Sequence, residues 1–241
     1  MTRNSTLVLA SFSFALAFVA GATPAISENA PPLVERVLTQ EEQEKLTPDE
    51  VLRLLQDGNR RFVSGTLTSR DHSKLVREAA KGQFPKAMIL SCVDSRIPVE
   101  DVFDRGIGDV FVARVAGNFE NTDILGSIEF ACKVSGAKLV LVLGHEHCGA
   151  VKAAIDGAVL GNITPMLENI KPAVESVAGY KGDKSSNNPG FVHMVAEKNV
   201  RLTIEDIRTR SPILKEMEDE GKIKIVGAMY SMDTGEVEFL E

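Results

Sequence analysis

Two short stretches of the chain contain residues that could bind a metal ion. The first runs from Cys92 to Arg96 (CVDSR) and the second from His145 to Cys148 (HEHC). Each follows a run of apolar residues typical of a buried β-strand. If those runs are neighbouring parallel strands, both stretches emerge at the carboxyl edge of one sheet, where open α/β folds place their sites. Two thiols and one imidazole would then meet, and a Cys2His set is known from zinc sites that keep one position open for water or substrate.

The second stretch offers two histidines, and spacing alone does not choose between them. Adjacent positions at a strand end point in opposite directions, so His145 and His147 could share a face while Cys148 belongs to the start of a helix. The third cysteine of the chain, Cys132, lies in a segment whose apolar residues recur at helical spacing. We expect it to be a buried, unreactive thiol.

Asp94 and Arg96 stand two residues apart, close enough for a bidentate pair between carboxylate and guanidinium. The pair could simply stabilise the loop. It could also hold Asp94 clear of the metal, so that the carboxylate accepts a hydrogen bond from zinc-bound hydroxide. Without Arg96, Asp94 could become a fourth ligand and close the site. The sequence permits both geometries.

Two glycine-containing segments invite other interpretations. Gly149 directly follows Cys148, and a backbone N–H at the start of a helix can hold an oxyanion. The Gly106-Ile107-Gly108 segment does not indicate a dinucleotide site, because it lacks a third glycine and precedes a strand instead of following one.

The composition is that of a globular protein without a nucleic-acid partner. The 241 residues are 44% hydrophobic and 25% charged, which is ordinary for a globular chain. The net charge of -7 argues against nucleic acid, because a phosphate-binding surface needs a concentrated excess of Lys and Arg.

Residues 1–22 have the pattern of a secretory signal peptide. Arg3 is followed by an uncharged run from 7 to 19 and by small residues suited to cleavage. The run is short for a membrane span, so we expect a cleaved signal, no membrane contact afterwards and, for a bacterial chain, a periplasmic location. Zinc would protect Cys92 and Cys148 in that oxidising compartment. Residues 23–46 are predicted to be a tether.

The rest of the chain, 47–241, predicts one α/β domain with a central, mainly parallel sheet of four to five strands, flanking helices and an N-terminal helical arm. Thr47, Pro48 and Glu50 indicate a capped helix start. Strands are expected at 87–92, 110–115, 138–143 and 223–230, with an antiparallel edge at 237–240. Helices are expected from 47, at 72–81, 98–103, 121–135, from 148 to 157, at 163–177 and at 192–209, with an exposed loop at 179–189.

With these residues in view, the chain resembles the β-class carbonic anhydrases from about Thr47 to Leu240. Residues 92–96 stand at that family's C-x-D-S-R and residues 145–149 at its H-x-x-C-G. The resemblance implies one zinc ion per subunit, bound by Cys92, His145 and Cys148, with His147 as a neighbour. It also makes Asp94 and Arg96 the catalytic dyad.

The same resemblance implies the reaction and the substrate pocket. The expected activity is that of a carbonate dehydratase, the reversible hydration of carbon dioxide to bicarbonate and a proton by attack of zinc-bound hydroxide. Gln83 matches a glutamine that contacts substrate in plant-type members, Phe111 resembles a wall of the apolar pocket, and Phe130 is expected to complete it from the partner subunit. Gly149 is expected to orient a substrate oxygen.

The family forms dimers, tetramers or larger assemblies, with the N-terminal helices embracing the neighbouring subunit. Some members are regulated through a bicarbonate pocket lined by a tryptophan. Pro98 and Glu100 match part of that pattern, but the chain has no Trp, so we do not expect this regulation.

Two alternatives remain open. One is hydrolysis of carbonyl sulfide or carbon disulfide, which relatives with the same ligands perform. The other is a non-catalytic zinc-binding periplasmic protein in which Asp94 is a permanent fourth ligand. For carbon dioxide hydration itself, we expect activity that rises toward alkaline pH, because two thiolates nearly cancel the metal charge and so lower the pKa of the bound water less.

Overall fold

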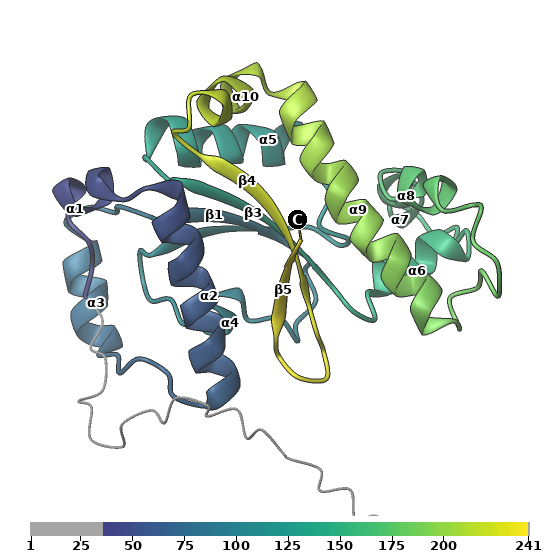
Figure 1. Ribbon diagram of the computed structural model, residues 1–241, viewed down its shortest axis with the longest axis horizontal. Helices are drawn as coiled ribbons and strands as arrows, with labels where there is room; N and C mark the ends of the chain where they lie inside the picture. The colour runs from purple at the N-terminus through teal and green to yellow at the C-terminus, as the bar shows by residue number, and fades with distance from the viewer. Residues whose placement is uncertain (1–35, 241) are drawn as a thin grey trace, which may run out of the picture. The chain divides into compact units, whose positions relative to one another are not determined.

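A five-stranded sheet forms the centre of the protein in the computed structural model, which describes residues 36–240 (Figure 1). The strand order is β2-β1-β3-β4-β5. The first four strands are parallel and β5 pairs antiparallel with β4, so the predicted α/β fold is confirmed. The strands are β1 (Ala87–Ser91), β2 (Val110–Arg114), β3 (Leu139–His145), β4 (Lys224–Tyr230) and β5 (Val237–Leu240).

Helices cover both faces of this sheet. One face packs against a core that includes residues of α5, α6, α8, α9 and α10, and the other against residues of α2 and α4 (Figure 1). The helices are α1 (Gln40–Lys45), α2 (Pro48–Ser64), α3 (His72–Ala79), α4 (Val99–Val102), α5 (Thr122–Glu129), α6 (Gly149–Ile155), α7 (Ile163–Leu167), α8 (Lys171–Ser176), α9 (Pro189–Arg210) and α10 (Pro212–Asp219). Because both faces are covered, β1 and β3 are buried along their whole length.

The register of the central strands fixes the edge at which the two motifs emerge. β1 pairs with β3 so that Ser91 lies opposite Leu143. The next residue along the chain, Cys92, is therefore level with the end of β3, where His145 lies. The strands are parallel, so both chain segments leave the sheet at the same carboxyl edge.

The N-terminal part of the described chain contains one helix that the sequence pattern does not predict. Helix α1 lies inside the segment 23–46 that was predicted to be a tether, and Thr39 and Glu42 form a capping box at its start. The buried side chain of Gln43 donates hydrogen bonds to the carbonyl oxygens of Pro85 and Ser135, which fixes α1 on the domain. The predicted signal peptide and the start of the tether lie outside the described residues.

Three other helical segments differ from the prediction. The helix expected at 163–177 is two short helices, α7 and α8, and Pro172 stands in the first turn of α8, where a helix can begin but not continue. The helix expected at 121–135 changes after Glu129 into a π-helical turn, Phe130–Val134. Helix α10 was not predicted, although Ser211 caps its start.

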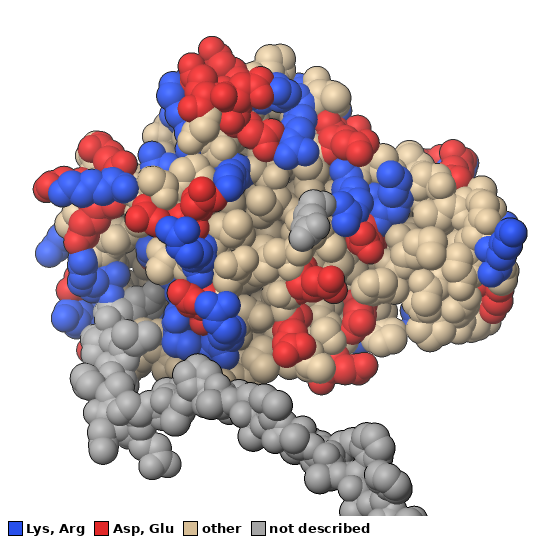
Figure 2. All heavy atoms as spheres, viewed as in Figure 1, with Lys and Arg blue, Asp and Glu red and all other residues tan. Residues whose placement is uncertain are grey.

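The visible surface carries acidic and basic side chains side by side. Figure 2 shows them interspersed over the face that carries α2 and α9, with acidic side chains gathered over α10. Among residues 36–240, no helix is both long enough and apolar enough to cross a membrane.

Helix α2 packs so closely on the chain after α4 that one glycine becomes essential. A Cβ at Gly58 would overlap the carbonyl oxygen of Phe103. Alanine usually stabilises a helix interior by about 1 kcal/mol relative to glycine, but here overpacking should cost about 1–3 kcal/mol. We therefore expect Gly58→Ala to lower the urea midpoint of unfolding. Gly190→Ala is the control, because its Cβ would meet only the Asn188 Oδ1 atom at 3.5 Å. A Gly58→Ala midpoint at or above that of the unmodified protein would contradict the packing argument.

Candidate metal centre

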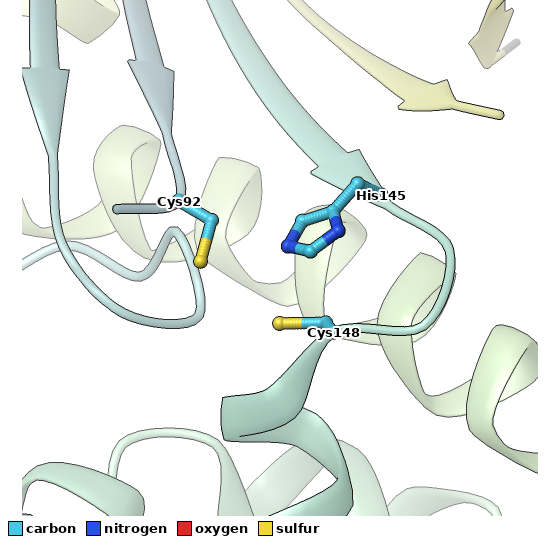
Figure 3. Close-up of side chains that lie close together, drawn as sticks. All are labelled: Cys92, His145 and Cys148. Carbon is cyan, nitrogen blue, oxygen red and sulfur yellow. The ribbon is translucent and has the colours of Figure 1, made fainter. Parts of the chain in front are cut away.

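Three side chains from the two motifs converge at the carboxyl edge of the sheet. Cys92 directly follows β1, His145 is the last residue of β3, and Cys148 directly precedes α6. One ligand atom from each residue lies within 4.8 Å of the other two. All three residues are buried, with exposed fractions of 3%, 1% and 0%. Figure 3 shows the two sulfur atoms and the imidazole facing a common point.

The ring of His145 is oriented with one nitrogen toward that point. Its Nδ1 atom lies 2.8 Å from the carbonyl oxygen of Glu146, and because a carbonyl only accepts, Nδ1 is the donor. The Nε2 atom is then an acceptor, and it is buried without a hydrogen-bond partner in the described part of the chain. A buried polar atom without a partner is costly, whereas a metal ion would satisfy this nitrogen.

The two thiols of the group differ strongly in acidity. A hydrogen bond from Cys148 lowers the pKa of Cys92 to about 4, against the opposing effect of burial. The same contact raises the pKa of Cys148, and burial raises it further. One thiolate therefore forms readily and the second does not. A divalent cation would favour both thiolates, since thiolate and not thiol is the form that binds metal.

The structure brings His145, and not His147, together with the cysteines. His147 belongs to a different group of side chains, with Glu146 and Asp233. Its backbone has a φ of 54°, in the left-handed region, which interrupts the alternation of directions expected at a strand end. Two sulfur atoms and one imidazole nitrogen are ligands that suit zinc, and they leave a fourth position open. The residues present thus fit a zinc ion.

Asp94 and Arg96 form the predicted bidentate pair beside these ligands. Arg96 Nε donates to Asp94 Oδ1 at 2.9 Å, and an Arg96 terminal nitrogen donates to Oδ2 at 2.7 Å. The Arg96 backbone N–H also donates to Oδ1 at 3.0 Å. These bonds hold the pKa of Asp94 well below its usual range. The Asp94 carboxylate is not part of the ligand group formed by the described residues.

Arg114 fixes the loop that carries Cys92 and Asp94, and the sequence pattern does not single it out. Its guanidinium donates to the carbonyl oxygens of Cys92, Asp94 and Ile97 at 2.8, 2.6 and 2.9 Å. It is the last residue of β2 and lies opposite Ser91 in the register with β1. An arginine near the end of the strand predicted at 110–115 was the available signal. Finding its partners required the strand order.

The residues predicted to contact substrate lie at different places on the chain. Gly149 is exposed and begins α6 directly after Cys148. Gln83 is exposed before β1, so a five-residue strand of roughly 17 Å separates it from Cys92. Phe111 lies opposite Met88 on β1, about 13 Å along the sheet from Cys92. Of these residues, only Gly149 lies beside the metal ligands of its own chain.

Phe111 and Phe130 line an open cavity of about 670 Å³. Their ring centroids are 6.3 Å apart and the rings meet edge to face. Phe130 is 51% exposed, which is unusual for so large an apolar side chain. The two predicted pocket residues are therefore brought together within one chain.

Known proteins with similar sequences and folds place this chain in a family. Residues 87–237 match the sequence model of carbonic anhydrase. Carbonic anhydrase 2 of Mycobacterium tuberculosis is 36% identical over 189 residues, which cover 76% of this chain and 88% of that protein. The β-carbonic anhydrase CafA of Aspergillus fumigatus superimposes with a TM-score of 0.63 at 28% identity, over 70% of this chain and 82% of that one. One of two tetrameric β-carbonic anhydrases from Sordaria macrospora gives a TM-score of 0.60 at 26% identity, over 68% and 85%. The chain therefore belongs to the β-class of the carbonic anhydrase family, the carbonate dehydratases.

Proposed function

We propose that the protein catalyses the reversible hydration of carbon dioxide to bicarbonate and a proton, with one zinc ion per subunit. The observation that carries this proposal is the buried group of Cys92, His145 and Cys148 beside the Asp94–Arg96 pair. Family membership supports the reaction, and the unpartnered His145 Nε2 supports the metal.

Cys92, His145 and Cys148 would hold the zinc ion. When bound, it supplies a Lewis acid that lowers the pKa of water and so makes a nucleophile available near neutral pH. Because all three ligand residues are buried, they would separate the zinc ion from bulk water on the protein side of the site. The remaining groups needed for the reaction are those that orient water and carbon dioxide.

Asp94 is suited to orient a water molecule and not to remove its proton. Its depressed pKa keeps the carboxylate ionised at neutral and alkaline pH, so it acts only as a hydrogen-bond acceptor. A carboxylate of such low basicity is a poor general base. Arg96 fixes the direction of the carboxylate through two parallel hydrogen bonds. The direction from which Asp94 accepts a hydrogen bond from water is therefore set before substrate arrives.

The geometry at Asp94 argues against a purely structural zinc protein. That alternative requires the carboxylate as a fourth ligand. In the structure, both carboxylate oxygens accept hydrogen bonds from Arg96. To bind a metal ion, Asp94 would have to exchange at least one of these charge-assisted bonds, so the open arrangement is favoured.

We further propose that the active unit is a dimer or a tetramer. Gln83 and Phe111 are too far along the sheet to reach the metal ligands of their own chain, but a second copy could present them. Phe130 is half exposed, as expected for a residue that completes a neighbour's pocket. A relative from Sordaria macrospora is described as tetrameric.

We also propose that the protein is exported to the periplasm. This proposal rests on the pattern of residues 1–22, namely Arg3, an uncharged run and small residues at the expected cleavage point. These residues lie outside the described range, and tagged expression with N-terminal sequencing of the mature protein would test the cleavage.

Stopped-flow measurement of carbon dioxide hydration tests the main proposal. The purified protein should accelerate hydration, lose that activity when a chelator removes zinc, and regain it when stoichiometric zinc is restored. Magnesium added to the chelated protein is the control, since this hard cation prefers oxygen ligands. A zinc-loaded, folded protein with no hydration above background would overturn the proposal.

A further inference from the structure

A chain of two hydrogen bonds connects the middle of α9 to one of the metal ligands. The backbone N–H of Gly117 donates to the sulfur of Cys92, with 3.3 Å between nitrogen and sulfur. The carbonyl oxygen of the same glycine accepts a hydrogen bond of 2.8 Å from the side-chain amide of Asn199. A single residue of the loop after β2 therefore connects the thiol to a helix 82 positions further along the sequence.

Gly117 is held in a conformation that suits this bridging role. Its φ of 89° lies in the left-handed region that favours glycine. A Cβ at this position would overlap the side chain of Ile170, which is itself fully buried. Gly117 is thus confined on the side of Ile170, held by Asn199 at its carbonyl oxygen, and directed at Cys92 by its N–H.

Asn199 and Thr203 are polar residues among the otherwise apolar buried side chains of α9. Asn199 is 2% exposed, and buried neighbours on the same helix include Val195, Ala196 and Val200. A buried amide carries a desolvation cost unless it is hydrogen-bonded, and apolar side chains such as these carry none. Packing alone therefore does not explain an asparagine at this position.

We propose that Asn199 is a positioning residue for the metal centre, because it holds Gly117 at its carbonyl oxygen so that the N–H of the same residue donates to the Cys92 sulfur. This inference rests on the proposed function, in which Cys92 is a zinc ligand. An N–H donor withdraws electron density from a thiolate and fixes the direction of its lone pairs. Outer partners of metal ligands commonly set both the geometry and the electronic character of a site.

Asn59 provides a matched control for the effects of removing a buried asparagine. It is 6% exposed, and its side-chain amide donates to the carbonyl oxygens of Val102 and Gly235. Its Oδ1 accepts from the backbone N–H of Val237. These contacts tie α2 to the chain on the opposite face of the sheet from α9, and none of them involves a metal ligand.

Zinc competition with a chromophoric chelator tests the proposal on the full-length protein. Asn199→Leu should weaken zinc binding by about 10–100-fold, the range typical of lost outer-shell partners. Asn59→Leu should lower stability and leave zinc affinity within about twofold of the unmodified protein, because it contacts none of the outer partners of the ligands. Equal zinc affinity in Asn199→Leu and the unmodified protein would overturn the inference.

Cobalt substitution supplies a readout that a merely structural role would not change. In Asn199→Leu the Gly117 N–H is no longer held toward the Cys92 sulfur, which keeps more electron density, so the sulfur-to-cobalt charge-transfer band should move to longer wavelength. The ligand-field bands should keep their tetrahedral pattern, because the ligands are unchanged. A charge-transfer band at the same wavelength as in the unmodified protein would contradict the proposal. If the leucine variant does not fold, Asn199→Ala removes the amide without adding bulk, and the same cobalt spectrum is measured on that variant.

A measurement on the unmodified protein needs no folded variant. In protein labelled with ¹⁵N and loaded with ¹¹³Cd, the Gly117 amide proton should show scalar coupling to the metal through the Cys92 sulfur. Absence of that coupling would overturn the inference whatever the variants do. The failures are distinguishable: an unmodified protein that binds no zinc defeats the proposed function, whereas normal zinc binding by Asn199→Leu defeats only the role of Asn199.

Discussion

Replacing Asp94 with asparagine should remove most of the carbon dioxide hydration activity and leave zinc bound. The new side chain would keep nearly the same shape, but its amide offers one acceptor oxygen where the carboxylate offers two, and it carries no charge to pair with Arg96. Loss of one group that orients reacting atoms typically costs about 10²–10³-fold in rate. The expected result is a decrease of that size in kcat/KM, measured by stopped flow, with zinc stoichiometry near one per subunit.

Asp219→Asn on α10 is the control for this change. Asp219 is also an acidic residue in an ion pair, with Lys215, and it is exposed. This variant should keep full activity. Two results for Asp94→Asn would count against the proposal. Loss of zinc would indicate that the carboxylate is a ligand and the site is closed, and unchanged activity would show that Asp94 does not act on the substrate water.

The second large effect is expected from alanine at His145, compared with alanine at His147 in the same motif. His145→Ala removes the only imidazole of the buried ligand group, so zinc should no longer survive gel filtration and hydration should fall to background. His147→Ala leaves all three ligands in place. We therefore expect it to retain zinc, measured by elemental analysis of the purified protein.

This pair of variants separates ligand loss from damage to the motif. Both remove a histidine from the same four-residue stretch, and His147 has the more strained backbone, with a φ of 54°. Alanine at either position also removes a side chain of the same volume. Zinc loss from His147→Ala together with zinc retention by His145→Ala would reverse the ligand assignment.

The convergence of the two motifs could be predicted from the sequence, because the apolar pattern and the geometry of parallel sheets lead to the same placement. Apolar runs before Cys92 and His145 indicate buried parallel strands, and parallel strands must deliver their carboxyl ends to one edge. The structure confirms this placement. The choice of His145 over His147 could not be made from spacing, since it depends on the left-handed turn at His147. At the level of sequence, only the family resemblance selects His145.

Contacts between distant parts of the chain were beyond the reach of the sequence pattern. Gly117 and Asn199 are 82 positions apart, and no periodicity connects them. Helix α1 has only six residues, too few to show a helical period, and its docking depends on Gln43 reaching Pro85 and Ser135. The substrate-pocket residues stay a prediction, because Gln83 and Phe111 need a second copy of the chain to reach the metal ligands.

The strand order also governs when the metal centre can form during folding. Cys92 follows β1 and His145 ends β3. After β1, the chain forms β2 on one side of β1 and then returns to form β3 on the other side. Contacts between such distant segments are slow to form, because the loop-closure entropy must be overcome first. The complete ligand set therefore requires β1 and β3 to have paired. We expect metal uptake to follow that pairing and not to nucleate it.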